Sequence, residues 1–546
     1  MAILEPSAAQ HPASRHIWRW IIVAVLLVIT GLAVAAIVVI RRATPILKGR
    51  VIETLSERFR SRVELDDLQV SLLKGLEVSG SGLRIFPPYD VVAAGANAPL
   101  ISVRSFYFHA GIRDLFVKPM HVSTVHVEGL NVTIPPREVR QQVAASSPSQ
   151  PRTKHKIDIQ VDEIVCDDSA LVIQTAKPGK DPKIFILTHI SLHDFGPNTP
   201  WPYEAQITNG IPEGKIHATG HFGPWNVESP GDSPLDGHYT FDHANLYPIK
   251  GIGGVLSSVG DFSGQLNRIG VQGTARVPNF SLDSASHPMP LDTTFSAVVD
   301  GTSGDTYLQH VDALLGHSRF TCNGEIVNVK GQGHIIDLDL DVPAGRIEDF
   351  LQLAVKTQPV IMTGVFGTRS HIHIPPGKES VTHKLNLKGR FTLHQVRFTN
   401  PAWQQKVDEL SARAEGRPED AKPGAAIVNS QMTGVFQMTG GRMDFSNLNY
   451  TIPGAAVVLE GLYTLDGKTF DFHGKVRTQA KASQMVVTPW KSWLLKAVDP
   501  FLAKHGAGLE VPFKVSGTNG EPKFGLDFGH KDKGDRLANP PPLKPR

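Results

Sequence analysis

The sequence predicts a mainly β protein in which one N-terminal transmembrane helix precedes a long, curled antiparallel sheet. Apolar and polar residues alternate with a period of two through most of the chain, which places the apolar ones on one face of each strand. A glycine repeatedly stands where the next apolar residue is due, and glycine inside a strand marks a bend, a bulge or a close approach. An uncharged apolar run near the N-terminus predicts the helix.

The strand pattern is clearest in four segments that each carry a glycine in phase: 269–277 with Gly273, 320–326 with Gly324, 385–393 with Gly389 and 457–465 with Gly461. A sheet that is apolar on one face and able to bend sharply is suited to wrapping around apolar material. The residues expected to form the wall of such a hydrophobic groove are Val271, Ala275, Val277, Ile326, Leu385, Leu387, Phe391, Leu393, Val457, Leu459, Tyr463 and Leu465.

Composition narrows the class of protein. A chain of 546 residues is too long for one compact core, and its 50 glycines and 40 prolines fit frequent turns between short strands. The net charge is only +3 and no basic block is present, which argues against a nucleic-acid partner. Cys166 and Cys322 are best explained as small buried apolar residues, with a disulfide as the alternative.

The apolar run from Trp20 to Ile40 carries no charge. About 20 helical residues span the ~30 Å hydrocarbon layer of a membrane. We therefore expect a tail over 1–19 and an uncleaved signal-anchor over 20–41; a cleaved signal peptide, whose apolar region is shorter, is the alternative. Four basic residues follow the span and two precede it, so a charge count favours a cytoplasmic C-terminal body, but large domains translocate despite this bias.

The rest of the chain divides into four regions and a tail. Residues 42–134 start with a short helix near 46–60, predicted by an apolar residue at every fourth position, and continue as strands. The apolar phase flips at Gly129, which predicts a β-bulge there. A Pro/Ser/Gln-rich linker over 135–156 leads to a β region over 157–410.

Short helices and turns interrupt the later part of the chain. Residues 346–355 predict a short helix, and 416–425 predict a loop. The last folded region, 411–530, contains a hairpin signal at Asp466-Gly467 and an amphipathic helix near 485–503. The tail over 531–546 is charged and proline-rich, which is typical of disorder.

Motifs for catalysis or cofactor binding appear only as near misses, so we expect no catalytic residues, no cofactor and no metal. Residues 461–469 end like a phosphate-binding loop, but the spacing is one residue too long and a hairpin turn explains them. His371 and His373 share a strand face, as do the three alternating aspartates of 337–341, and a solvated outer face is favoured over a metal site for both. Ordinary turn chemistry likewise explains the aspartates of 300–305.

Several segments resemble the AsmA family of bacterial envelope proteins. At the N-terminal end the matching pieces are the lone apolar span, Leu55–Phe59 with Val63 and Leu65, Lys74–Gly80, Ile112–Pro119 and Val125–Leu130; at the other end they are Gly441–Phe445, Val458–Gly461, Asp499–Phe501 and Pro522–Gly525. The region between about 157 and 396 is connected to these segments only by its continuous β pattern.

The resemblance implies a single-pass protein of the bacterial inner membrane with its C-terminal body in the periplasm and its N-terminus inside. It also implies kinship with bridge-like lipid transfer proteins of the TamB and YhdP type, whose curled sheet carries phospholipid along a hydrophobic groove toward the outer membrane. This chain is shorter than those relatives. The partners that the resemblance implies are phospholipid or another lipid, the inner membrane and other envelope proteins.

Three functions are therefore compared. The first is a non-enzymatic protein that shields or transfers lipid along an apolar sheet face and supports outer-membrane biogenesis. The second is a scaffold or assembly factor for outer-membrane proteins, with the same strands packed as ordinary cores and partners bound at exposed edges. An envelope hydrolase is the weakest, because no nucleophile–base pair emerges from the sequence.

Overall fold

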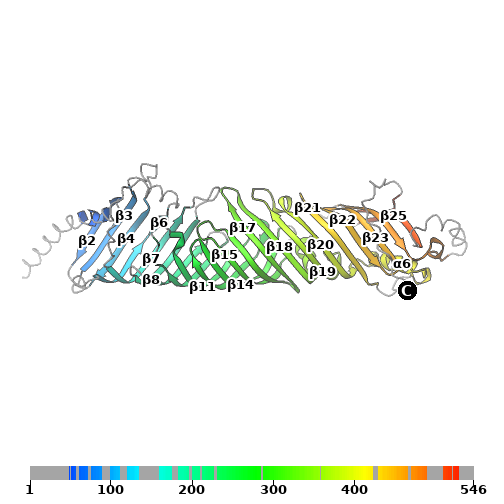
Figure 1. Cartoon of the computed structure of the whole chain (residues 1–546), viewed down its shortest axis with the longest axis horizontal. Helices are drawn as coiled ribbons and strands as arrows, with labels where there is room; N and C mark the ends of the chain where they lie inside the picture. The colour runs from blue at the N-terminus through cyan, green and yellow to red at the C-terminus, as the bar shows by residue number, and fades with distance from the viewer. Residues whose placement is uncertain are drawn as a thin grey trace, which may run out of the picture. The chain divides into compact units, whose positions relative to one another are not determined.

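The computed structural model has a mainly β architecture, one large mixed sheet with a few short helices (Figure 1). It describes residues 48–49, 51–53, 55–56, 61–71, 76–88, 99–110, 120–134, 159–174, 183–195, 199–209, 212–224, 226, 230–283, 287–356, 358–421, 428–464, 469–487, 508–518 and 521–527. The contacts divide the chain into two compact units, which are described separately.

The first unit holds strands β1 (Ser61–Glu64), β2 (Asp67–Ser71), β3 (Leu76–Pro88), β4 (Ile101–Ala110), β5 (Met120–Glu128), β6 (Asn131–Ile134) and most of β7 (Ile159–Ile173). Strands β1 and β2 both pair with β3, which pairs with β4, and β4 pairs with β5 and β6, all antiparallel. Strand β5, however, pairs with β7 in parallel. The sheet is therefore mixed, whereas the sequence predicts a purely antiparallel one. A parallel pair needs a long crossover, and the 24 residues from 135 to 158 separate β6 from β7.

The predicted bulge at Gly129 takes a different form. Gly129 adopts the left-handed φ of 66° and separates β5 from β6, but both strands pair with β4 in one unbroken register. Gly82 in β3 has the same φ of 66°, so neighbouring strands change their backbone conformation together. The switch of the apolar residues from odd to even positions at Gly129 therefore occurs without an extra residue in any one strand. The prediction of a bulge at Gly129 is wrong.

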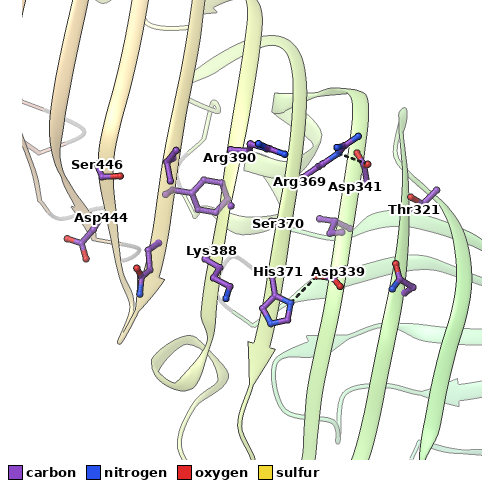
Figure 2. A pocket seen from close by; sticks show the side chains of 16 residues that line it. Thr321, Asp339, Asp341, Arg369, Ser370, His371, Lys388, Arg390, Asp444 and Ser446 are labelled. Atoms are coloured by element: carbon purple, nitrogen blue, oxygen red, sulfur yellow. Dashed lines mark hydrogen bonds and ion pairs between the residues drawn. The ribbon is translucent and has the colours of Figure 1, made fainter. Parts of the chain in front are cut away.

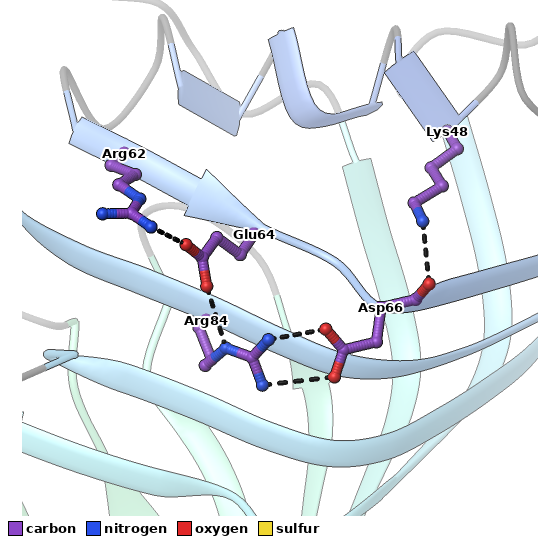
Figure 3. A network of polar contacts seen from close by, with 5 residues as sticks. All are labelled: Lys48, Arg62, Glu64, Asp66 and Arg84. Carbon is purple, nitrogen blue, oxygen red and sulfur yellow. Dashed lines mark hydrogen bonds and ion pairs between the residues drawn. The ribbon is translucent and has the colours of Figure 1, made fainter.

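Ion pairs connect the first residues of this unit to β3 (Figure 3). The guanidinium of Arg84 donates from Nη2 and Nη1 to the two carboxylate oxygens of Asp66, at 2.5 and 3.2 Å, and from Nε to Glu64 Oε2 at 3.1 Å. Lys48, which is helical, donates from Nζ to the backbone carbonyl of Asp66 at 2.7 Å. Hydrogen bonds from Arg84 and from Arg62 lower the pKa of Glu64 below its ordinary value.

The second unit is an antiparallel meander in which most strands pair with the next one along the chain. Its strands are β9 (Trp201–Asn209), β10 (Glu213–Phe222), β11 (Pro234–Asn245), β12 (Ile252–Gly253), β13 (Val255–Gln265), β14 (Arg268–Leu282), β15 (Met289–Val299), β16 (Thr306–Leu315), β17 (Ser318–Val329), β18 (Gly333–Arg346), β19 (Met362–Ile374), β20 (Asn386–Phe398), β21 (Ser430–Thr439), β22 (Arg442–Ile452), β23 (Ala455–Thr464), β24 (Phe470–Thr478), β25 (Leu509–Gly517) and β26 (Pro522–Leu526). Strand β8 (Lys183–Phe195) is divided between the units.

Turn chemistry fixes the hairpins of the meander. Between β21 and β22 the pair Thr439–Arg442 closes a two-residue turn of Gly440 and Gly441, with φ of 61° and 75°. Positive φ at both central positions is the turn that suits the twist of a hairpin, and glycine adopts it without a steric cost. The predicted hairpin around 466–467 is confirmed by the antiparallel pairing of Tyr463 with Phe470, although 465–468 themselves lie outside the described residues.

Few helices accompany the strands. The predicted helix over 346–355 is confirmed as α4 (Ile347–Ala354), and 48–49, 51–53 and 55–56 are helical within the predicted segment 46–60. Helix α6 (Pro401–Ala414) was not predicted, although Asn400 caps it by accepting hydrogen bonds from Ala402 N and Trp403 N and Pro401 suits the first helical position. The remaining short helices are η2 (Pro230–Asp232), α5 (Val381–Lys384), η3 (Pro418–Asp420) and η4 (Ala482–Gln484).

Several predicted segments lie outside the described residues. They are the tail over 1–19, the apolar span over 20–41, the linker over 135–156, most of the helix near 485–503 and the tail over 531–546. Among the residues with a described structure, no helix combines the length and apolar character needed to cross a membrane.

Both cysteines are free and lie in strands, Cys166 buried in β7 and Cys322 half-buried in β17. Burial raises the pKa of the Cys166 thiol to about 11. A thiol that stays protonated in an apolar setting behaves as a small hydrophobic side chain. The preferred interpretation of the cysteines is thus confirmed and the disulfide alternative is wrong.

The ion pairs around Glu64 predict a pH dependence of the first unit. Because the folded-state pKa of Glu64 is lowered, its contribution to stability is present above the ordinary value of 4.5 and is lost as the pH falls through the folded pKa. We expect the hydrogen-exchange protection factors of amides in β1 and β3 to fall on acidification below pH 4.5 more in the wild type than in Glu64→Gln. An equal fall in the two proteins would contradict this role for Glu64.

Candidate functional site

The two faces of the sheet in the second unit differ sharply in character. In β14, Val271 and Ala275 are half-buried and Val277 is buried, whereas the residues between them, such as Gln272 and Thr274, are exposed. We call the face toward which Val271, Ala275 and Val277 point the apolar face, and the opposite one the polar face. Alternation of this kind is what a sheet with one sheltered side requires.

The register carries the apolar face from strand to strand. Gly273 in β14 lies opposite Phe295 in β15, and Phe295 lies opposite Val311 in β16. Val311 lies opposite Cys322 in β17, which in turn lies opposite Leu340 in β18. Because antiparallel partners point to the same side of a sheet, one uninterrupted row of apolar and small residues crosses five strands.

Aromatic rings fill the space beside the in-phase glycines. Gly434 in β21 lies opposite Phe391, and a Cβ added to this glycine would stand 2.8 Å from Phe391 Cε1. A Cβ added to Gly461 in β23 would stand 2.8 Å from Phe472 Cδ1 and 2.1 Å from the carbonyl oxygen of Asp471. Close approach is realised at Gly461 and Gly434, where ring and backbone occupy the space of a side chain, and the pairing of β22 with β21 and β23 also shifts register beside both glycines.

The structure brings five of the twelve predicted wall residues into one cluster, which we call the β20–β25 cluster. These five are Leu387, Phe391 and Leu393 of β20 and Val457 and Leu459 of β23. They pack with further residues that were not predicted, among them Ile347 of α4, Phe436, Phe445, Phe472 and Val476. All five predicted members except Leu387 are buried, so at these strands the apolar face forms a closed core.

The other predicted wall residues lie apart from this cluster. Val271, Ala275, Ile326, Leu385 and Tyr463 are half-buried, Val277 is 3 % exposed, and Leu465 lies outside the described residues. Ile326 continues a row of half-buried isoleucines, because it pairs with Ile336 in β18, which pairs with Ile374 in β19. Along β14–β19 the apolar face is therefore buried only in part, since Val277, Ala297 and Val311 are buried while Val271, Ala275 and Ile326 are half-buried. In the β20–β25 cluster it is buried.

The cluster members that were not predicted belong to other segments of the chain, and those segments also carry apolar patterns. Phe436 and Phe445 belong to alternating strands like those that were singled out, and Ile347 occupies the buried face of the predicted helix α4. No pattern within one strand indicates which aromatic ring reaches which glycine. That pairing depends on the register of strands up to some 45 residues apart, such as Phe391 and Gly434.

The histidines and aspartates that resembled a metal site lie on the polar face and pair across strands. Asp337, Asp339 and Asp341 of β18 face His373, His371 and Arg369 of β19, respectively. The three contacts, His373 Nδ1–Asp337 Oδ2, His371 Nδ1–Asp339 Oδ1 and Arg369 Nε–Asp341 Oδ2, measure 2.9, 3.0 and 2.9 Å. The favoured interpretation, a solvated outer face, places these residues correctly.

The aspartates of 300–305 also have structural roles. Asp300 Oδ1 accepts hydrogen bonds from the backbone N and the hydroxyl of Thr302, and Asp305 Oδ1 accepts one from the backbone N of Asn328. Both aspartates are buried. Ordinary turn chemistry accounts for these contacts, as the sequence predicts.

Two hollows lie over the polar face. One, of about 860 Å³, is lined by residues of β17–β22, among them Asp341, Arg369, His371, Lys388 and Arg390 (Figure 2). The second, of about 920 Å³, is lined by polar residues of β13–β17 such as Thr274, Thr294 and Arg319. Sequence reasoning about the apolar face gave no indication of either hollow, since concavity arises from the twist of many strands together.

No family model, no curated protein and no solved structure matches the chain. The resemblance to the AsmA family consequently stays an expectation from the sequence. The function has to be argued from the two faces of the sheet and from the side chains they present.

The close packing around Gly461 predicts a steep cost for any side chain there. Gly461→Ala should destabilise the second unit by about 1–3 kcal/mol, because its methyl group would overlap a carbonyl oxygen and a ring. Gly525→Ala in β26 is the matched control, since a Cβ there would meet nothing within 4 Å. Chemical denaturation of both variants measures the difference, and equal stability would show that the close approach at Gly461 is not needed.

The β20–β25 cluster predicts a large effect of removing one ring. Phe391→Ala should lower the free energy of unfolding by about 3–5 kcal/mol, because the ring is buried and fills the space beside Gly434. Val435→Ala, on the polar face and 47 % exposed, should change it by less than about 0.5 kcal/mol. A small loss in the Phe391 variant would mean that the apolar face is loosely packed at these strands as well.

Proposed function

We propose that the chain is a membrane-anchored, non-enzymatic envelope protein of the AsmA type that shields or transfers lipid along the apolar face of its sheet and so supports outer-membrane biogenesis. In this proposal the apolar face of a curled sheet forms a hydrophobic groove. Acyl chains shelter along that face while headgroups stay in water. No bond is made or broken, so no catalytic residue or cofactor is needed.

The observation that carries the proposal is the change in burial along one continuous apolar face. Val271, Ala275 and Ile326 are only half-buried, although Val277 and Ala297 beside them are buried, whereas Phe391 and Leu393 are buried in a closed core. Half-buried aliphatic side chains in a row offer an acyl chain a surface to cover, and each CH₂ group removed from water contributes about 0.8 kcal/mol. Even a single acyl chain would therefore be held firmly.

The proposed location follows from the sequence. Residues 20–41 would anchor the protein in the bacterial inner membrane as a single span, with 1–19 in the cytoplasm and the C-terminal body in the periplasm. That orientation rests on the resemblance to the AsmA family and runs against the simple charge count. Lipid and the inner membrane are then the primary partners, and other envelope proteins would accept the lipid.

The β20–β25 cluster favours a second candidate function, a scaffold or assembly factor for outer-membrane proteins that carries no lipid. At these strands the apolar residues already bury one another, which is what an ordinary core does. If the half-buried strands behaved in the same way in solution, no lipid would be bound. The two functions therefore differ in what covers the apolar face around β14 and β17.

Site-specific crosslinking separates the two functions. A photoreactive amino acid placed at Val271 or at Ile326 should capture phospholipid in the membrane-bound full-length protein, because both side chains lie on the half-buried part of the apolar face. Placed at Gln272, the neighbouring exposed residue on the polar face, it should capture much less. Mass spectrometry of the purified adducts identifies the lipid and measures the difference.

The control for folding is the thermal stability of each labelled protein. Crosslinked lipid at Val271 and Ile326 but not at Gln272 supports the lipid function. Equal capture at all three positions, or none at the two apolar ones in a folded protein, would overturn it and leave the scaffold function.

A further inference from the structure

The hollow of about 860 Å³ on the polar face gathers basic side chains from two adjacent strands (Figure 2). Arg369 and His371 come from β19, and Lys388 and Arg390 come from β20. All four line the hollow, and Figure 2 shows the side chain of Arg390 directed toward Arg369. This surface is distinct from the apolar face to which the proposed lipid function belongs.

The register places the basic residues of β19 directly opposite those of β20. Arg369 pairs with Arg390, and His371 pairs with Lys388. Directly opposed residues in an antiparallel pair have their Cβ atoms about 4.5–5.5 Å apart, and like charges in that position are destabilising. On its other side Arg390 lies opposite Val435, which carries no charge. The pairing of β19 with β20 thus keeps Arg369 and Arg390 in a position that destabilises the fold.

The nearby carboxylates do not relieve this repulsion fully. Asp341 accepts a hydrogen bond from Arg369 Nε at 2.9 Å, and Asp339 contacts His371 Nδ1 at 3.0 Å. Asp444, also at the hollow, is engaged by Arg442. Lys388 and Arg390 have no ion-pair or hydrogen-bond partner for their charged groups among the described residues. Two cations therefore face the hollow with their charge uncompensated.

We propose that this hollow binds a phosphate group, held by Arg390 and Lys388 with Arg369 alongside. Guanidinium groups recognise phosphate oxygens through paired hydrogen bonds, and lysine adds a compact charge. The amides of Asn323 and Gln437 and the hydroxyl of Ser446, which also line the hollow, suit the polar remainder of a phosphate ester. A bound phosphate turns the like-charge opposition into a favourable one, which explains why the strands retain it.

The phosphate could be free or part of a lipid headgroup, and three soluble probes distinguish these sources. They are glycerol 3-phosphate, short-chain phosphatidylglycerol and short-chain phosphatidylcholine, titrated calorimetrically into the full-length protein in a non-ionic detergent. The two lipids share their acyl chains, so a difference between them reports the headgroup. Binding of glycerol 3-phosphate assigns the site to a free phosphate ester, and binding of phosphatidylglycerol alone assigns it to an anionic headgroup.

Four variants test the residues. Arg390→Gln and Lys388→Gln should each weaken binding by about tenfold or more, since hydrogen bonds to charged groups are the strong ones. Arg397→Gln is the matched control, because Arg397 is an exposed arginine of the same strand that does not line the hollow. Asp341→Asn should strengthen binding several-fold by releasing the charge of Arg369.

The decisive signature is the behaviour of the ligand-free variant. Arg390→Gln should leave the midpoint of thermal unfolding unchanged or higher, because it removes a like-charge opposition, while it loses phosphate binding. A purely structural arginine would lower the midpoint. The proposal is overturned if none of the three probes binds, if Arg390→Gln binds as tightly as the wild type, or if Arg397→Gln weakens binding equally. These outcomes leave lipid capture at Val271 unaffected, so the two proposals fail separately.

Discussion

The structure of the second unit depends on one constraint, the register of its antiparallel strands. This register keeps small and large apolar residues complementary although irregularities shift it within many of the strand pairs. A shift of one residue would turn every apolar side chain of a strand to the polar face. The glycines sharpen this constraint, because the ring of Phe391 occupies the space that a side chain at Gly434 would need. Register, core packing and the separation of the two faces are consequences of the same pairing.

Much of this could be predicted from the sequence, because alternation, turn chemistry and helix capping are local. The β class, the helix α4 and the hairpin between β23 and β24 follow from residues close together in the chain. The parallel pairing of β5 with β7 does not, because it depends on where the chain returns after residues 135–158. Helix α6 was foreseeable as well, because Asn400 and Pro401 suit its first turn. Its apolar residues Trp403, Val407, Leu410 and Ala414 also follow helical spacing.

The candidate site was predictable only in part, and for a physical reason. Alternation identifies which residues face the same way, and it selected Leu393 and Val457 correctly as members of one cluster. It does not reveal what covers that face, so buried Leu393 and half-buried Val271 look alike in the sequence. The polar hollow was missed because its cations, Arg369 and Arg390, become neighbours only through the pairing of β19 with β20.

If the chain binds lipid as proposed, the uneven burial of the apolar face would link that binding to stability. Apolar surface left in contact with water forgoes about 25 cal/mol per Å², so the half-buried strands contribute less to folding than the closed β20–β25 cluster. A ligand that binds the folded state alone adds stability by mass action. An acyl chain lying along Val271 and Ile326 would thus supply to the central strands what Phe391 and Phe436 supply to the later ones.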